Sequence, residues 1–354
     1  MAKWDKDYLE LCKRILKEGT EVENRTGVNT IKVPSHHFHF DLEEEFPILT
    51  TKQLFIRQAV LEMLWIYQNQ SNDVRWLQER NVHIWDEWEV DEDGIYRIYE
   101  APSEQTPYDK DREVPVLDPY SVPVHNHNGK LDYKRDENGN ILTAKSLSEE
   151  NSLKMFPDHE TVKKNIKTAK FYGKQYAHTI GTAYGYIVGK FEMVQNLINN
   201  LKTNPNDRRN VMSLWQDDYV NTAVLPSCVW SSEWDVTDGK LNAWVHQRSC
   251  DVPLGLPFNV TQYSVLLNML ARVTNLKPGT LDWSIKDAHI YVNQIEGIKE
   301  QIRRGEELED LKAPELWLNP KVTDFFDFDS SKECKDVKLL NYKHHGKIRF
   351  PLAQ

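Results

Sequence analysis

The residues best suited to chemistry in this chain are a cysteine and an arginine placed around two predicted strands. Cys228 precedes a strand pattern at Trp230–Val236, and Arg248 follows a second pattern at Leu241–Val245. Asp238-Gly239 between the two is a strong signal for a tight hairpin, which would bring Arg248 near the thiol. A cation beside a cysteine lowers its pKa and favours the nucleophilic thiolate. A lone cysteine in a strand is more often a small buried hydrophobic residue, so chemistry alone leaves both interpretations open.

The sequence around these two residues resembles one enzyme family. Residues 226–228 read PSC, and residues 247–259 read QRSCDVPLGLPFN. The second string fits the pattern QRSxDxxLGxPFN of the thymidylate synthase active site, and it is too long to match by chance. The resemblance implies that Cys228 is the catalytic nucleophile, with Arg248 and Asp251 beside it in the catalytic site.

A predicted helix from about Phe55 to Gln68 is apolar nearly all round and contains one acidic residue, Glu62. A glutamate on a polar-faced helix is usually solvated, but few polar neighbours favour burial here. Burial raises the pKa of a carboxyl group, as a proton relay near neutral pH requires. The resemblance places Glu62 on the family's catalytic glutamate, and it implies that Tyr184, in the string GTAYG, supports Cys228.

Several arginines are candidates for a phosphate site. The net charge is −10, so an anionic substrate needs a local cluster of cations. Arg25 lies in the polar turn RTGVNT, and the adjacent Arg208 and Arg209 would by themselves be surface residues. The resemblance implies that Arg25, Arg248 and Ser249 bind the nucleotide phosphate, and that Arg208 and Arg209 reach the partner's site across a homodimer. Arginine forks match phosphate oxygens in two-point geometry.

The nucleotide implied by the resemblance is dUMP. The amide of Asn259 offers a donor and an acceptor that match O4 and N3–H of uracil, whereas a carboxylate would favour cytosine. Gln247 is expected in the same hydrogen-bond network. The string DAHIY at 287–291 implies that His289 and Tyr291 hold the deoxyribose hydroxyl.

A folate site is implied by the string VHIWDEW at 82–88. Tryptophans three residues apart could simply belong to a core. The resemblance implies a wall for the pterin and aminobenzoate rings, for which flat aromatic surfaces are suited. The folate-binding residues that it implies are Ile84, Trp85, Trp88, Asp251, Leu254, Gly255, Phe258 and, in a C-terminal lid, Ala353.

The implied reaction is the reductive methylation of dUMP to dTMP. The cosubstrate 5,10-methylenetetrahydrofolate supplies both the carbon and the hydride, dihydrofolate is released, and no metal is needed. Cys228 attacks C6 of uracil and makes C5 nucleophilic. A dUMP hydroxymethylase, in which water replaces hydride, is the close alternative; Trp85 in a water-excluding wall favours the synthase. RNA binding is at most secondary, because the chain is acidic.

The fold implied is of the α/β class (α+β type), with a large mixed, mainly antiparallel twisted sheet. Helices would cover one face, and the other would pack on a second subunit. The resemblance covers residues 1–89 and 180–354, so we expect one domain with an insertion at about 90–178. Inside the insertion the patterns favour an extended surface path, a hairpin between Asn128-Gly129 and Asn138-Gly139, and a helix over Asp158–Lys170. A further helix is expected from about Val260, just after Asn259.

The composition is that of an ordinary soluble protein. The chain has 354 residues, of which 40% are hydrophobic and 28% charged. No apolar run approaches the length of a membrane span, and the N-terminus has no signal-peptide core. Four cysteines without metal-ligand or secreted-disulfide spacing indicate a reducing, cytoplasmic setting.

Overall fold

The computed structural model describes residues 1–123, 125–146 and 164–352. The chain forms two compact units. Unit 1 comprises Met1–Asn69, Lys190–Leu214 and Cys228–Gln354, and unit 2 comprises Gln70–Gly189 and Trp215–Ser227. One domain with an insertion at about 90–178 stays a prediction.

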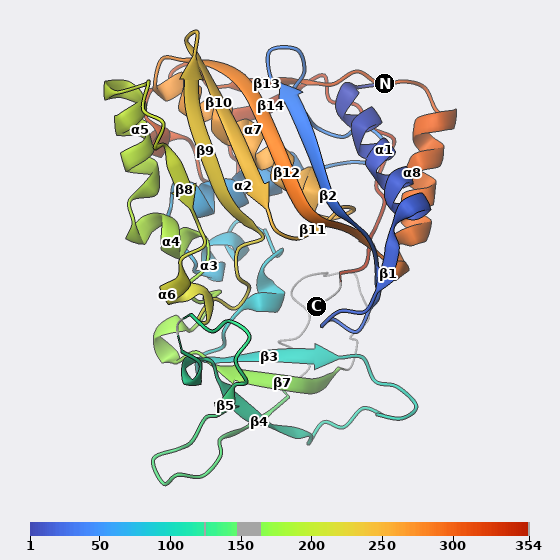
Figure 1. Ribbon diagram of the computed structural model, residues 1–354, viewed down its shortest axis with the longest axis vertical. Helices are drawn as coiled ribbons and strands as arrows, with labels where there is room; N and C mark the ends of the chain where they lie inside the picture. Colours follow the sequence, from blue (N-terminus) through green and yellow to red (C-terminus); the bar gives the residue numbers. More distant parts are fainter. Residues whose placement is uncertain (124, 147–163, 353–354) are drawn as a thin grey trace. The chain divides into compact units, whose positions relative to one another are not determined.

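Unit 1 is built on a mixed sheet. Within the described residues the sheet has seven strands. Their order is β1 (Thr20–Val22), β2 (Thr30–Asp41), β12 (Lys277–Tyr291), β10 (Lys240–Gln247), β9 (Val229–Thr237) and β8 (Val211–Ser213), with β11 (Cys250–Asp251) beside β12. Strand β12 pairs in parallel with β10 and β11, and the remaining neighbours are antiparallel. The expectation of a mixed, mainly antiparallel sheet is confirmed (Figure 1).

Helices pack on one face of this sheet. On α1 (Lys3–Glu18), the ring of Trp4 lies 5.0 Å from those of Phe38 and Phe40 on β2. The neighbouring residues His37 and His39 alternate with these phenylalanines and are exposed on the opposite face, as the two-residue period of a strand requires.

Helix α7 (Gly255–Val273) packs on the same sheet, where Tyr263 meets Trp283 of β12 at a ring distance of 5.4 Å. Its other side contacts α2 (Ile56–Tyr67), and the hydroxyls of Tyr67 and Tyr263 are hydrogen-bonded. The other elements of unit 1 are α5 (Met193–Thr203), α8 (Ile295–Glu307) and a small sheet of β13 (Glu315–Leu318) with β14 (Val337–Leu340).

Helix α7 begins earlier than predicted. The sequence prediction placed the helix start at about Val260, but the helix begins at Gly255 and Asn259 lies inside it. Pro257 occupies the first turn, where a backbone N–H has no partner within the helix and proline is therefore tolerated. The prediction took the polar side chain of Asn259 as a cap, whereas it points from the helix toward polar partners described below.

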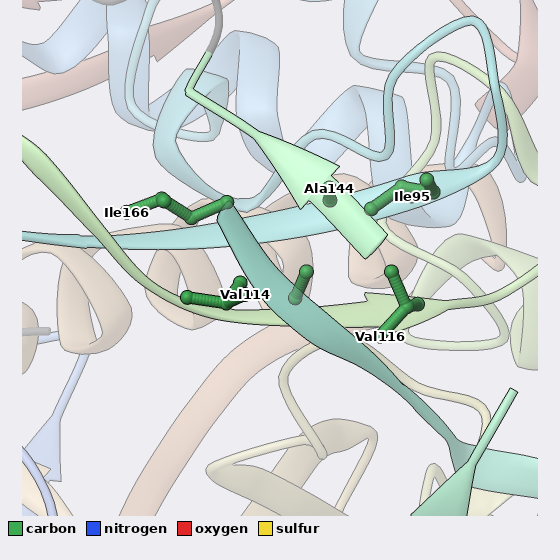
Figure 2. Packing of buried hydrophobic residues seen from close by; sticks show 6 residues of the cluster. Ile95, Val114, Val116, Ala144 and Ile166 are labelled. Atoms are coloured by element: carbon green, nitrogen blue, oxygen red, sulfur yellow. The ribbon is translucent and has the colours of Figure 1, made fainter. Parts of the chain in front are cut away.

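Unit 2 contains its own sheet, in the order β3 (Ile95–Glu100), β7 (Asn165–Phe171), β4 (Glu113–Asp118) and β5 (Asp132–Tyr133), with β6 (Thr143–Lys145) beside β4. Its short helices are α3 (Val74–Gln78), α6 (Asp217–Val220) and α4 (Gly185–Lys190), the last of which ends in unit 1. Figure 2 shows side chains from these strands gathered into a core. Its buried members are Ile95, Val114, Val116, Ala144, Ile166 and Ala169.

Two predictions for the insertion were wrong. The extended surface path contains β4, whose Val116 is fully buried, because alternate residues of this proline- and charge-rich stretch face the core. The expected helix over Asp158–Lys170 is replaced over Asn165–Phe171 by strand β7, which pairs with β3 and β4. Residues 158–163 of that predicted helix lie outside the described residues.

The predicted hairpin is present in a different register. Arg135 and Ile141 form a bridge, and Gly139 occupies the turn with a φ of 83°. Asp132 and Tyr133 pair instead with β4. The second Asn-Gly pair therefore forms the tight turn.

Truncating Ile166 should destabilise unit 2. This side chain has no exposed surface, so Ile166→Ala removes buried methyl groups and leaves a cavity that costs about 2–5 kcal/mol. Hydrogen exchange of the β3 and β7 amides is the measurement, because it reports local opening. The matched variant Ile166→Val should cost about 0.5–1.5 kcal/mol. Equal protection in both variants would contradict the packing described here.

Candidate active site

The four cysteines differ sharply in accessibility. Cys12, Cys250 and Cys334 are buried, whereas Cys228 is partly exposed. Burial raises the pKa of Cys12 and of Cys334 to about 12, and it raises the pKa of Cys250 well above the usual range of a thiol. These three thiols therefore stay protonated near neutral pH, and Cys228 is the one that can meet a substrate.

The β9–β10 hairpin brings Arg248 to Cys228. Asp238 and Gly239 have φ values of 50° and 72°, as a tight turn with two left-handed residues requires. At the open end of the hairpin, the Arg248 N–H donates to the Cys228 carbonyl at 2.9 Å. The Arg248 guanidinium lies 3.8 Å from the Cys228 sulfur. The predicted proximity of the two residues is confirmed, and the positive charge stabilises a thiolate.

Glu62 is buried in α2 with 9% of its surface exposed, as its apolar surroundings predicted. Nε2 of Gln262 on α7 donates to its Oε2 atom and, at 3.2 Å, to the Ala59 carbonyl. Oε1 of Gln262 accepts from Nδ2 of Asn259 at 3.2 Å. Gln262 therefore connects the predicted proton relay to the predicted base-recognition residue.

The other side of Asn259 faces β10. Its Oδ1 accepts from Nε2 of Gln247 at 3.2 Å, and Oε1 of Gln247 accepts from the indole of Trp283 at 3.0 Å. The predicted network of Gln247 and Asn259 is present. Sequence reasoning missed Gln262 and Trp283; the spacing of Gln262, three residues after Asn259 on one helix, could have indicated a contact.

Asp251 lies at the end of β11, just before α7. Its Oδ1 accepts from the Leu254 N–H at 3.0 Å, and its Oδ2 accepts from Gln294 at 3.2 Å. Burial raises the pKa of Asp251, and these hydrogen bonds partly oppose that rise. Gly255 and Phe258 follow within the first turns of α7 and are partly buried, as is Ser249.

The end of β12 carries the residues predicted to bind the sugar. His289 is buried, and its Nδ1 lies 2.8 Å from Asp287 Oδ1. That hydrogen bond, together with Lys32, lowers the pKa of Asp287 to about 2. The ring of Tyr291 lies 5.2 Å from that of His289. The aspartate thereby fixes the imidazole beside the phenol.

The environment of Tyr291 also locates Arg25. Burial raises the pKa of Tyr291; the negative charge of Asp251 adds to that rise, and the positive charge of Arg25 opposes it. Arg25 itself is exposed in the turn before β2, where Asn24 Oδ1 accepts from the Thr26 N–H at 2.9 Å. Arg25 is therefore an exposed cation at the same end of unit 1 as Tyr291.

Arg208 and Arg209 differ in their contacts. Arg209 forms a two-point ion pair with Asp207, with N–O distances of 2.9 and 3.0 Å. This pairing lowers the pKa of Asp207 to about 2. Arg208 is exposed and has no hydrogen bond or ion pair with any residue that the structure describes. Arg208 is the better placed of the two to meet a ligand or a partner.

The aromatic residues predicted for folate form a cluster within unit 2. The Trp85 ring lies 5.4 Å from the rings of Trp88 and Tyr184, and Ile84 precedes it in a partly buried position. The predicted support of Cys228 by Tyr184 stays a prediction. Ala353, the predicted lid residue, lies outside the described residues.

The described ranges contain no group of three or more histidine, cysteine or acidic side chains placed to hold a metal ion. Within the same ranges, no helix has the length and apolarity needed to cross a membrane.

Comparisons with known proteins agree over the whole chain. The family model described as thymidylate synthase matches residues 6–354. Thymidylate synthase of Clostridium beijerinckii is 38% identical over 353 residues, and thymidylate synthase 1 of Bacillus subtilis is 32% identical over 372 residues; both matches cover 100% of each chain. The solved structure of thermostable thymidylate synthase A from Bacillus subtilis covers 99% of both chains, with 31% identity and a TM-score of 0.68.

These matches define an enzyme that transfers one-carbon units. The chain belongs to the thymidylate synthase family. Because the matches extend over whole chains, these relatives also carry a counterpart of residues 90–178.

Proposed function

We propose that this protein converts dUMP to dTMP, with 5,10-methylenetetrahydrofolate as carbon donor and reductant. The observation that carries the proposal is the accessible Cys228 thiol with the Arg248 guanidinium 3.8 Å away, in a chain that matches the family from residue 6 onward. The other three thiols are buried, which supports Cys228 as the nucleophile.

The reaction begins at the thiol. Cys228 attacks C6 of uracil, and the adjacent positive charge of Arg248 favours the thiolate that does so. C5 becomes nucleophilic and bonds to the folate methylene. Glu62, buried and hydrogen-bonded to Gln262, relays protons at the pyrimidine. Proton loss from C5 then breaks the bond between the methylene and the folate and leaves an exocyclic methylene on C5 with free tetrahydrofolate. Hydride from tetrahydrofolate reduces this methylene to methyl while the Cys228 sulfur is expelled from C6, and dihydrofolate and dTMP leave.

In this proposal, residues of unit 1 make the nucleotide contacts. Arg25, Arg248 and Ser249 bind the phosphate, and His289 with Tyr291 holds the deoxyribose hydroxyl. The amide of Asn259 pairs with O4 and N3–H of uracil. Asp251, Leu254, Gly255 and Phe258 contact the folate, as do Ile84, Trp85 and Trp88, and Tyr184 assists the thiol.

The direct test supplies dUMP and methylenetetrahydrofolate to the purified protein. Dihydrofolate absorbance is followed, and the mass of the nucleotide product is measured. We expect dihydrofolate and a methylated nucleotide in equal amounts. A hydroxymethylated nucleotide without dihydrofolate would mean that water replaces hydride and would reject the synthase assignment.

The protein is proposed to act as a homodimer in which Arg208 and Arg209 bind the partner's phosphate. We expect Arg208→Glu and Cys228→Ala to be inactive separately. A mixed dimer of the two would hold one intact site if Arg208 acts in the partner, because one subunit supplies the arginine and the other the thiol. The measurement is activity after denaturation and co-refolding, with separately refolded variants as the control. No regain of activity on mixing would contradict a trans role for Arg208.

A further inference from the structure

The hydrogen bonds that link Trp283, Gln247, Asn259, Gln262 and Glu62 form one continuous chain inside unit 1. In every link the donor belongs to the residue nearer Trp283 and the acceptor to the residue nearer Glu62. The chain therefore has a single direction, from the indole on β12 to the carboxylate on α2.

The two ends of the chain impose this direction. An indole N–H can only donate a hydrogen bond, and at the other end the Ala59 carbonyl, which accepts from Nε2 of Gln262 beside Glu62, can only accept one. Each amide between them could be placed either way round by itself. Turning the amide of Asn259 would set its nitrogen against that of Gln247 and its oxygen against that of Gln262. Only the observed orientation gives every amide both an acceptor and a donor.

Gln262 is fixed from a second direction as well. The two hydrogens of its Nε2 atom go to Glu62 Oε2 and to the carbonyl oxygen of Ala59, both of which are acceptors. Its Oε1 atom can therefore only face Asn259. The orientation of the Asn259 amide is thus determined by Glu62 and Ala59, which act on it through Gln262.

We propose that Trp283 and Gln262 are positioning residues that hold the Asn259 amide in the orientation that selects uracil over cytosine. This inference rests on the proposed function, in which Asn259 contacts the base. In the observed orientation, one Nδ2 hydrogen and one Oδ1 lone pair have no partner among the described residues. They match O4 and N3–H of uracil; cytosine presents a donor and an acceptor in the reverse places and needs the turned amide.

Burial makes the turned amide unfavourable. Trp283 has no exposed surface, Gln247 is 3% exposed and Gln262 is 6% exposed. Water cannot replace the hydrogen bonds that turning Asn259 would break, and donors facing donors in a low-dielectric interior repel one another. Binding of cytosine is therefore disfavoured, because it would require breaking the hydrogen bonds that link Trp283 to Glu62 through Asn259.

The first test replaces Trp283 with phenylalanine, which keeps an aromatic ring and removes the donor. Calorimetric titration of dUMP and dCMP, without folate, gives the ratio of their affinities. We expect the preference for dUMP to fall by about tenfold, as expected for one net hydrogen bond. Trp234→Phe is the matched control, because Trp234 is also buried and its indole donates to Ser232 at 3.0 Å. That hydrogen bond is not part of the chain of hydrogen bonds that reaches Asn259. An equal ratio in both variants would overturn the proposal.

The second test, Gln262→Glu, distinguishes orientation from packing. An ionised carboxylate at position 262 can only accept, so it still takes the hydrogen bond from Nδ2 of Asn259 and holds that amide in the observed orientation. The preference for dUMP should therefore be kept, although the ionised side chain can no longer donate to Glu62. Gln262→Leu has a similar size and no acceptor, so it should lose part of the preference.

The outcomes of these experiments separate the two proposals. A Gln262→Leu variant that keeps the full wild-type preference for dUMP would overturn the positioning role, and the proposed conversion of dUMP to dTMP would still stand. A wild-type protein that binds neither nucleotide would overturn the proposed function and this inference with it.

Discussion

Replacing Cys228 with alanine is expected to lower kcat by about 10⁴-fold or more, because the covalent bond to C6 can no longer form. No other thiol can substitute, since burial keeps Cys12, Cys250 and Cys334 protonated and inaccessible. Binding of dUMP should persist, because the phosphate and sugar contacts belong to other side chains. Dihydrofolate absorbance measures the loss of turnover, and calorimetry measures the dUMP dissociation constant.

The control for this experiment is Cys334→Ala. Cys334 is a buried thiol in the C-terminal part of unit 1, and no step of the proposed reaction uses it. We expect nearly wild-type kcat in this variant. Substantial turnover by Cys228→Ala would contradict nucleophilic catalysis by Cys228, whatever the behaviour of the control.

Replacing Glu62 with glutamine is expected to lower kcat by about 10²- to 10⁴-fold, the range for a lost general acid–base group. Glutamine has nearly the same shape, and its Oε1 atom can still accept the hydrogen bond from Gln262. The KM for dUMP should therefore change little, since the variant loses proton transfer rather than a binding contact. Steady-state kinetics separates the two quantities, and release of tritium from C5-labelled dUMP reports loss of the C5 proton.

The matched control is Glu10→Gln, which makes the same substitution at an exposed position of α1. Its kinetics should equal those of the wild type. A large rise in KM with unchanged kcat in Glu62→Gln would mean that Glu62 contributes binding alone, and the proton-relay assignment would then be wrong.

Some features of the site depend on local sequence alone. The pair Asp238-Gly239 adopts left-handed backbone angles that few other residues tolerate, so the hairpin between Cys228 and Arg248 was predictable from adjacent residues. The burial of Glu62 followed from the apolar residues that surround it in its own helix. In both cases the determining interactions lie within a few residues in the chain.

Other features depended on contacts between distant segments. Residues Asn165–Phe171 form a strand because β3 and β4 supply hydrogen-bond partners. Those partners lie some fifty to seventy residues earlier in the chain, and local propensity is easily overridden by such pairing. The start of α7 at Gly255 was likewise missed, because the first turn of a helix accepts proline and leaves only a weak local signal.

The sequence by itself determined which groups are proposed to react or to bind the base, namely Cys228, Arg248, Glu62 and Asn259, since this proposal rests on their residue types and neighbouring strings. Only the tertiary structure decided which thiol is accessible and that Gln262 joins Glu62 to Asn259. It also decided that Trp283 is the first donor in the chain of hydrogen bonds. The physical reason is that burial and the direction of a hydrogen bond depend on what packs around a group. Those neighbours come from β10, α7, β12 and α2, which are far apart in sequence.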